Sequence, residues 1–292
     1  MGRHLERTME KIKKSRGIIA IIVSALLVGA LALFNQTSTQ QNKNFHGAIL
    51  PHHLLVQNYI DQFYEKLAKE NPETENILIV SPNHIGYGLN YMQTTNNFDT
   101  FPLAIQPILD TTKIQQLLDK TTLHLESKSF EKEHGIFLHL KYLKKYFPDA
   151  KLIPIILKIG TPQDRMDRLI ETLFDTLPAG TLIIASIDFT HYENEEIAVK
   201  NDERTINWLK ELKTIPPKTI RLDKIKKLSA STKQTNPDSV AFDSPESMYV
   251  MLKLLEKTKN LDFTLFQRTS TLSLTKLKNP LENTSHIFGE FN

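Results

Sequence analysis

The 292-residue chain contains no cysteine, and its net charge is only +3 with the histidines neutral. Without thiols the chain has no disulfide bond, no cysteine nucleophile, no lipid-modified amino-terminal cysteine and no thiolate metal ligand. A metal site would have to be built from histidine, aspartate or glutamate. The net charge is small and no basic stripe is interleaved with aromatic residues, so we expect no nucleic-acid partner.

The positive charge that the chain does have is concentrated at its amino terminus. Residues 1–16 carry more Lys and Arg than Asp and Glu, and residues 17–34 are apolar and uncharged over the length of a minimal membrane span. Basic residues before a span keep that side in the cytoplasm. We therefore predict a basic cytoplasmic segment at 1–16, a transmembrane signal anchor at 17–34, a polar linker at 35–44 and a folded domain at 45–292 outside the cytoplasm.

Two fates of the apolar segment fit the sequence. An uncleaved anchor would make a single-pass protein of the cell membrane. The run Ala30-Leu31-Ala32 also resembles a signal-peptidase site, and cleavage near Ala32 would release a secreted protein. The long basic region and the full-length apolar run favour the anchor.

Short apolar runs alternate with helical patterns through the predicted domain. Residues 47–50, 77–80, 151–157 and 181–187 have the pattern of buried strands, and amphipathic helices are predicted between and after them. Strands that alternate with helices are typical of an α/β fold with a parallel sheet. In such a sheet, ligands bind at the carboxyl ends of the strands.

Three segments give less regular patterns. Residues 90–110 alternate polar and aromatic residues without a clear period, which indicates a long loop with a hairpin. Pro154 cannot donate a hydrogen bond to a neighbouring strand, so it indicates an edge or irregular position in the strand that contains it. The lysine-rich residues 218–233 contain few apolar positions and are predicted to form a solvated surface element.

Histidines follow two successive strands at the point where each strand ends. His52 comes after the first predicted strand and His84 after the second, and a later strand runs into Asp188 and His191. Neighbouring parallel strands lie about 5 Å apart and end at one edge of the sheet. We therefore expect His52 and His84 to converge, although a single histidine in such a loop is more often an ordinary polar residue.

Two imidazoles and one carboxylate form a ligand set for a single metal ion. Fe(II) accepts this set on one face and keeps positions open for substrate and oxygen. Zinc accepts the same ligands with water in the remaining position. The predicted cofactor is a divalent metal, and the ligand set alone does not choose between Fe(II), zinc and copper. Glu133 is predicted to accept a hydrogen bond from a metal-bound histidine.

Other histidines are not expected to join this site. His53 follows the first predicted ligand directly, so its side chain should diverge from it. His139 lies five residues after His134 on a predicted helix, which places the two on different faces. His124 and His286 have no candidate ligand near them in the sequence.

Five ordered motifs extend over most of the predicted domain. They are Gly47-Ala-Ile-Leu-Pro-His-His53, Ile79-Val-Ser-Pro-Asn-His-Ile-Gly86, Glu133-His-Gly-Ile-Phe-Leu-His-Leu-Lys-Tyr-Leu143, Lys151-Leu-Ile-Pro-Ile-Ile-Leu157 and Ala185-Ser-Ile-Asp-Phe-Thr-His-Tyr192. Together they resemble the Memo family, labelled AmmeMemoRadiSam system protein B in bacteria. The resemblance implies a three-layer α/β/α sandwich with a largely parallel central sheet. This fold is similar to that of class III extradiol dioxygenases, the non-haem Fe(II) enzymes that open catechol rings.

The resemblance also implies roles for individual residues. By motif, His52 and His84 take the places of the family's two histidine ligands. Asp188 and His191 line the same pocket. His191 would act as acid and base, because the pKa of histidine lies near neutrality, and Asp188 would orient it.

The family's third metal ligand is a cysteine, which this chain cannot supply. The corresponding region reads Val240-Ala-Phe-Asp243, so the resemblance assigns the third position to Asp243. The site then becomes two histidines and a carboxylate, which suits Fe(II). Glu133 and His134 match a Glu-His motif of the family and are expected beside the ligands.

Three functions are compatible with these observations. The first is a membrane-anchored Memo-like metalloprotein with dioxygenase-like or other redox chemistry on a small-molecule substrate. The second is a non-catalytic module that binds a metal, a small ligand or a partner. The third is a metal-dependent hydrolase that uses a zinc-bound water.

Overall fold

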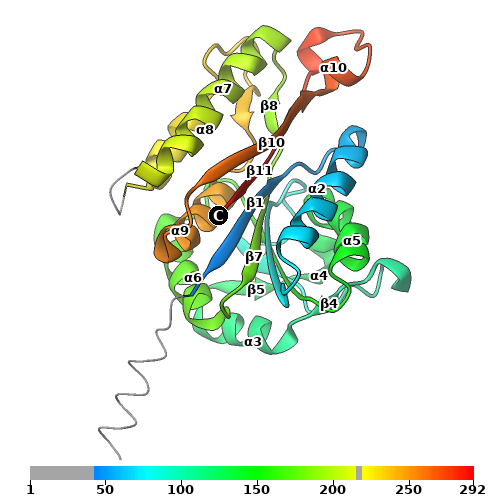
Figure 1. Cartoon of the computed structure of the whole chain (residues 1–292), viewed down its shortest axis with the longest axis vertical. Helices are drawn as coiled ribbons and strands as arrows, with labels where there is room; N and C mark the ends of the chain where they lie inside the picture. The colour runs from blue at the N-terminus through cyan, green and yellow to red at the C-terminus, as the bar shows by residue number, and fades with distance from the viewer. Residues whose placement is uncertain (1–42, 215–218) are drawn as a thin grey trace, which may run out of the picture. The chain divides into compact units, whose positions relative to one another are not determined.

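A mostly parallel sheet forms the centre of the domain (Figure 1). The computed structural model describes residues 43–214 and 219–292, and residues 44–292 form one unit. Among the described residues the main sheet has nine strands in the order β10-β11-β1-β7-β2-β6-β3-β5, with β4 paired to β6. Strands β8 and β9 form a separate two-stranded ribbon. The expectations for residues 1–16, the anchor at 17–34, cleavage near Ala32 and most of the linker fall outside the described residues.

The strands have the following bounds: β1 Phe45–Leu50, β2 Asn76–Pro82, β3 Met92–Thr94, β4 Ile108–Leu109, β5 Leu123–Leu125, β6 Lys151–Leu157, β7 Thr181–Ser186, β8 Phe189–His191, β9 Val240–Phe242, β10 Phe263–Ser270 and β11 Ser285–Phe291. The α-helices are α2 Gln57–Glu70, α3 Thr111–Lys120, α4 Ser127–Phe130, α5 His134–Tyr146, α6 Gln163–Thr176, α7 Glu195–Glu211, α8 Leu222–Ser229, α9 Pro245–Thr258 and α10 Thr271–Leu274. Single 3-10 turns are η1 Leu54–Val56, η2 Leu103–Ile105, η3 Leu212–Thr214 and η4 Pro280–Glu282.

The four inner strands β1, β7, β2 and β6 run parallel to one another. Within the main sheet, antiparallel pairing is confined to the pairs of β11 with β1 and β10 on one side and to the β3–β6 pair on the other. All four inner strands therefore end at the same edge of the sheet. The α/β architecture with a largely parallel sheet, predicted from the sequence, is confirmed.

Helices pack on both faces of the sheet because its inner strands are apolar on both faces. In β2, Leu78 and Val80 join one buried cluster, to which α6 and α9 contribute, and Ile77 and Ile79 join another, to which α2 and α5 contribute. Figure 1 shows the two helix pairs on opposite sides of β1 and β7. Continuous apolar runs of this kind are typical of strands covered on both faces.

Of the two alternatives for Pro154, an edge position or an irregular one, the structure shows the irregular one. Strand β6 lies inside the sheet, with β2 on one side and both β3 and β4 on the other. On that other side, β4 pairs with Lys151 and Leu152, and β3 pairs with residues 155–157, so Pro154 lies in the gap between them. Its carbonyl accepts a hydrogen bond from the Thr94 hydroxyl at 2.7 Å, and no N–H is needed there.

Two expectations need correction. Residues 90–110 hold no hairpin, because β3 pairs with β6 and β5 while β4 pairs with β6. Residues 222–229 of the lysine-rich segment form helix α8, whose Leu222 and Ile225 are buried in the core cluster that also includes α9. Two apolar residues three positions apart lie on one face of a helix, so they can anchor this short helix on the core while its lysines remain exposed to solvent.

No helix within residues 43–214 and 219–292 has the length and apolar character required to cross a membrane.

Candidate metal centre

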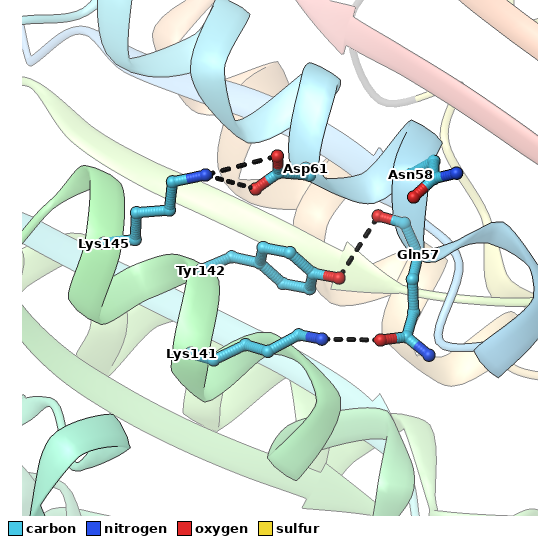
Figure 2. Close-up of a pocket in the computed structure, with 6 residues that line it drawn as sticks. All are labelled: Gln57, Asn58, Asp61, Lys141, Tyr142 and Lys145. Carbon is cyan, nitrogen blue, oxygen red and sulfur yellow. Dashed lines mark hydrogen bonds and ion pairs between the residues drawn. The ribbon is translucent and has the colours of Figure 1, made fainter.

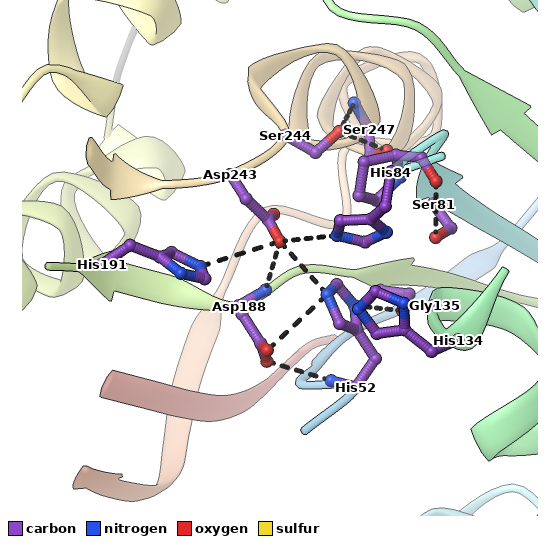
Figure 3. A network of polar contacts seen from close by, with 12 residues as sticks. His52, Ser81, His84, His134, Gly135, Asp188, His191, Asp243, Ser244 and Ser247 are labelled. Atoms are coloured by element: carbon purple, nitrogen blue, oxygen red, sulfur yellow. Dashed lines mark hydrogen bonds and ion pairs between the residues drawn. The ribbon is translucent and has the colours of Figure 1, made fainter. Parts of the chain in front are cut away.

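The carboxyl ends of three adjacent parallel strands bring polar side chains together (Figure 3). His52, His84 and Asp188 each lie two residues beyond the end of a strand, after β1 at Leu50, β2 at Pro82 and β7 at Ser186. Because β7 pairs with both β1 and β2, the three side chains enter one space. This is the convergence of His52 and His84 expected from the sequence.

The short β8–β9 ribbon supplies a fourth side chain, Asp243. Phe189 of β8 pairs with Phe242 of β9, which places Asp243 opposite Asp188. The Asp243 N–H donates to the Asp188 carbonyl at 3.1 Å, and the Asp188 N–H donates to Asp243 Oδ2 at 3.3 Å. Ser244 then caps α9, whose first residue is Pro245. The backbone on both sides of Asp243 is therefore fixed, and its carboxylate is held over the strand ends.

Three imidazole nitrogens approach one oxygen of Asp243. Asp243 Oδ2 lies 3.1 Å from His52 Nε2, 3.5 Å from His84 Nε2 and 4.0 Å from His191 Nε2. Two ligand atoms that are each about 2.1 Å from a metal at the tetrahedral angle lie about 3.4 Å apart. The first two distances therefore match the edges of a metal coordination polyhedron.

His134, the first residue of α5, joins the same group of rings. One ring nitrogen from each of His52, His84 and His134 lies within 4.8 Å of the others, the one such cluster among the described residues. The centroid of the His134 ring is 4.1 Å from that of His84 and 5.0 Å from that of His52. The sequence placed His134 beside the ligands, and the structure brings its ring close enough to be one.

Several polar atoms of this cluster are buried without a hydrogen-bond partner. They include His52 Nε2, His191 Nε2 and Asp243 Oδ1. Buried polar atoms in folded proteins almost always have partners, and an exception calls for an explanation such as a bound ion. Imidazole nitrogen and carboxylate oxygen are the donors that divalent transition metals accept. The residues present fit a cation of that class.

Glu133 fixes the orientation of His84. Its Oε1 accepts from His84 Nδ1 at 2.6 Å and its Oε2 accepts from the His84 backbone N–H at 2.8 Å. Glu133 is fully buried, and its Oε1 also accepts from the Gly135 N–H at 3.0 Å. Because Nδ1 donates to the carboxylate, Nε2 is the nitrogen that faces Asp243 and is available to a metal that displaces its proton. Glu133 thus has the position predicted for it.

Gly135 allows the Glu133 carboxylate to lie close to the end of β2. A Cβ atom at Gly135 would lie 2.0 Å from Ser81 Oγ and 3.2 Å from Glu133 Oε1. The amino end of α5 can therefore approach the end of β2 only without a side chain at this position. This contact sets the distance between His84 and the residues Glu133 and His134.

The titratable groups of the cluster shift one another's pKa values. Burial alone would lower the pKa of His84, but hydrogen bonds to Asp243 and Glu133 outweigh it and raise the pKa to about 10. Burial opposes ionisation of Asp243, yet His52 and His84 hold its pKa well below its usual range. Burial and the neighbouring His84 and His52 lower the pKa of His134 to about 4. In the metal-free protein, His84 therefore carries a positive charge facing two carboxylates.

The predicted pairing of Asp188 with His191 has a different geometry. Asp188 Oδ1 accepts from the His52 backbone N–H at 3.0 Å, and its Oδ2 lies 3.6 Å from His52 Nε2. Asp188 thus holds the His52 loop. The carboxylate nearest to His191 Nε2 is that of Asp243.

A protein-family model described as Memo-like protein matches residues 26–271. The chain belongs to this family. A MEMO1 family protein of Saccharolobus solfataricus is 28% identical over 156 residues, which cover 51% of this chain and 54% of that protein. One from Nitrosopumilus maritimus is 25% identical over 175 residues, which cover 59% of this chain and 63% of that protein. The chain thus spans little more than half the length of these relatives.

Among solved structures, this chain is similar to an uncharacterized protein of Escherichia coli K12, with 15% sequence identity and a TM-score of 0.49 over 85% of this chain and 99% of that one. The match of the family model to most of the chain confirms the resemblance inferred from the five motifs.

Two histidines of this Memo-like protein that the sequence left aside are buried next to the centre. His139 in α5 bonds to Ser186 Oγ at 3.1 Å, and Ser186 Oγ lies 2.9 Å from His52 Nδ1. His286 in β11 is fully buried, and its ring lies 4.9 Å from that of His53. His139 does not join the cluster of His52, His84 and His134, as expected, but Ser186 of β7 connects it to His52. No periodicity in the sequence reveals that contact.

The same Memo-like domain has a hollow of about 340 Å³ between α2 and α5 (Figure 2). Lys145 pairs with Asp61 at 2.9 Å, and Lys141 donates to the Gln57 side chain at 2.6 Å. The Tyr142 hydroxyl donates to the Gln57 carbonyl at 3.2 Å. These groups satisfy one another, so we place the functional site at the strand ends instead.

Proposed function

We propose that this Memo-like protein binds a divalent metal through His52 Nε2, His84 Nε2 and Asp243 Oδ2. The observation that carries the proposal is the approach of both nitrogens to one carboxylate oxygen, at 3.1 Å and 3.5 Å. The Nδ1 hydrogen bond of His84 to Glu133 supports it, because metal-bound histidines usually donate their other N–H to a carboxylate or carbonyl. Buried atoms without a partner at the same place support it further.

Fe(II) is the metal we favour. Two imidazoles and one carboxylate on one face, with open positions opposite, are typical of mononuclear Fe(II) oxygenases. The absence of thiolate and the presence of a hard carboxylate oxygen disfavour Cu(I) at this site. We further propose that the substrate is a small hydroxylated molecule.

A bound metal would supply Lewis acidity and, if it is Fe(II), a place for oxygen beside the substrate. His191 would accept and return the substrate's proton at Nε2, which is buried 4.0 Å from Asp243 Oδ2 and has no hydrogen-bond partner. Burial lowers the pKa of His191, so its ring is neutral near pH 7 and free to accept a proton. Asp188 would hold the His52 loop by accepting its backbone N–H.

Zinc-dependent hydrolysis is the second candidate, and one observation favours it. His134 adds a third imidazole to His52 and His84. Three protein ligands and one water form the usual catalytic zinc set. In this case the third ligand would be His134, and Asp243 would be placed to accept a proton from the water.

For the placement of the protein we propose a single membrane anchor at residues 17–34, with the metal domain outside the cytoplasm. The proposal is supported by the sequence alone, through the uncharged apolar run and the basic residues 1–16 before it. Mass spectrometry of the mature amino terminus tests it. A protein that starts near Ala32 would replace the anchor with a secreted form.

Metal analysis of the full-length protein tests the proposed centre. When the metal-free wild type is incubated anaerobically with Fe(II) alone, and a separate sample with Zn(II) alone, we expect each sample to bind one equivalent of metal. His52→Ala and His84→Ala should lose it, whereas His124→Ala, which removes a histidine on β5 outside the cluster, should retain it. Full metal content in both ligand variants would show that His52 and His84 are not the metal ligands.

Turnover then separates the two chemistries. Oxygen uptake by the iron form with catechols supports the oxygenase, and ester cleavage by the zinc form supports the hydrolase. Stoichiometric metal without either activity would favour a binding module.

A further inference from the structure

A buried chain of hydrogen bonds extends from His52 away from the metal centre. His52 Nδ1 lies 2.9 Å from Ser186 Oγ, which lies 3.1 Å from His139 Nε2. His139 Nδ1 in turn lies 3.0 Å from the Tyr64 hydroxyl. All four side chains are 1% exposed or less. Solvent is thus excluded along the whole chain.

The four residues come from four different parts of the fold. His52 follows β1, Ser186 ends β7, His139 lies in the middle of α5 and Tyr64 in α2. Helix α5 therefore contributes twice, with His134 at its amino end among the rings of the centre and His139 in its middle behind them. No single element holds the chain together, which means that tertiary packing alone creates it.

The chain can carry its protons in two directions. Burial lowers the pKa of His139 to about 3, so this ring is neutral and has one N–H. Burial also raises the pKa of Tyr64 well above its usual value, so the phenol keeps its proton. If His52 Nδ1–H donates to Ser186, then Ser186 donates to His139 Nε2 and His139 Nδ1–H donates to Tyr64. If the direction is reversed, Tyr64 donates and His52 Nδ1 becomes the final acceptor.

The two directions have opposite consequences for the metal site. In the first, the neutral His52 has its lone pair on Nε2, the atom that faces Asp243 at 3.1 Å. In the second, Nε2 carries the proton and cannot bind a metal. A ligand histidine at this position therefore requires the chain to run from His52 to Tyr64.

We propose that Ser186, His139 and Tyr64 are positioning residues that hold His52 in the tautomer protonated at Nδ1, with Nε2 presented to the cation. This inference rests on the proposed metal site and deepens it. Ser186 alone could accept the hydrogen bond from His52 Nδ1–H, but a lone hydroxyl rotates freely, whereas one that donates to His139 is fixed with its lone pairs towards His52. Tyr64 in turn accepts a hydrogen bond from the N–H that His139 must have at Nδ1.

The full-length protein loaded with Zn(II), which is diamagnetic, allows a direct test. Long-range ¹H–¹⁵N spectra of histidine-labelled protein should show His52 protonated at Nδ1 and coordinated through Nε2. Zinc affinity, measured by competition with a chromophoric chelator, should fall about 10- to 100-fold in Ser186→Ala, the range found for partners of metal ligands. Ser186→Thr, which keeps the hydroxyl, should recover most of that loss.

Tyr64→Phe gives a milder second variant, because it removes one oxygen and leaves the His139 Nδ1–H without an acceptor. We expect a loss of zinc affinity smaller than that in Ser186→Ala, on the order of threefold to tenfold by the same comparison. Tyr142→Phe is the matched control. Its ring stacks on Tyr64 with centroids 5.6 Å apart, but its hydroxyl donates to the Gln57 carbonyl and takes no part in the chain.

The outcomes separate the two proposals. A wild type that binds none of the metals would overturn the metal site and the positioning chain with it. A wild type that binds zinc with His52 protonated at Nε2 would overturn both His52 Nε2 as a ligand and the chain. A folded Ser186→Ala or Tyr64→Phe with wild-type affinity would overturn the chain alone. If Ser186→Ala does not fold, the difference between Tyr64→Phe and Tyr142→Phe decides.

Discussion

The strand-end cluster and the hollow between α2 and α5 both gather charged and aromatic side chains, but they differ in how those charges are satisfied. In the hollow, Lys145 and Asp61 pair at 2.9 Å and are 56% and 40% exposed. At the strand ends, His52 and Asp243 are 1% and 13% exposed, and each has a buried atom without a hydrogen-bond partner. Water can solvate the first pair at any time. It reaches the second pair far less.

This difference shows which of the two regions requires a ligand. An exposed ion pair is weak, and its loss leaves two solvated groups. A buried polar atom without a partner is costly, and folded proteins keep such atoms chiefly where a function uses them. The number of charges in a region therefore identifies a site less well than the number of unsatisfied buried donors and acceptors. The following variants test this contrast.

The largest effect is expected when the shared carboxylate is removed. Asp243→Ala deletes the oxygen that lies closest to both His52 Nε2 and His84 Nε2, so metal affinity should fall by more than about 100-fold, beyond the usual effect of outer partners. Metal titration of the full-length protein measures it. Asp188→Ala is the variant for comparison. Its loss of metal affinity should be smaller, because Asp188 contacts His52 chiefly by accepting its backbone N–H. Iron bound at full stoichiometry by Asp243→Ala would remove Asp243 from the ligand set.

A smaller loss of affinity is expected at Glu133. In the wild type, N–H groups of His84 and Gly135 donate to the two carboxylate oxygens of Glu133. Glu133→Gln keeps the shape of the side chain but replaces one of these acceptors with an amide N–H₂, which faces another donor. Metal affinity should fall about 10- to 100-fold. Glu131→Gln, an exposed position two residues earlier, should leave the affinity unchanged. Equal affinities in the two variants would mean that Glu133 has no role in orienting His84.

The third test uses pH on the metal-free protein. The folded-state pKa of His84, about 10, lies above its unfolded value of 6.5, because Asp243 and Glu133 face the ring, with the imidazoles of His52 and His134 beside it. The stabilisation is therefore complete below pH 6.5 and is lost as the pH rises from 6.5 towards 10. Metal affinity should rise over the same interval, because protons compete with the metal for histidine.

Urea unfolding in the presence of a chelator measures the first of these trends, and metal titration at the same pH values measures the second. In His84→Gln the fall in unfolding free energy between pH 6.5 and 10 should be much smaller. A wild-type stability that does not change over this interval would contradict the assigned charge of His84.

The part of the site at the carboxyl ends of the strands could be predicted from the sequence. Apolar runs that stop at His52, His84 and Asp188 reveal both the strands and the residues that follow them, and parallel pairing brings those residues together. Asp243 required more than periodicity. Its place follows from the family resemblance, and physically from the pairing of β9 with β8.

The buried hydrogen-bond chain behind His52 could not be predicted in this way. Tyr64 and His139 lie on two helices, and their spacing indicates only that each faces the core. Which strand residue each one meets is decided by how α2 and α5 pack on the sheet. The place of His134 beside the ligands was expected only from the family motif, because its physical basis is packing: the close contact of Gly135 with Ser81 sets how far the amino end of α5 reaches over the centre.

The smallest effect is expected in the hollow. Asp61→Asn removes the partner of Lys145, and the lysine becomes an unpaired ammonium in contact with water. Because both side chains are well exposed, solvation replaces the ion pair, and the unfolding free energy should change little. Metal affinity should equal that of the wild type, because none of the hydrogen bonds of this hollow involves His52 or His84. A loss of metal in Asp61→Asn would show that the two regions are coupled through the Tyr142–Tyr64 stack, and the contrast between them would then fail.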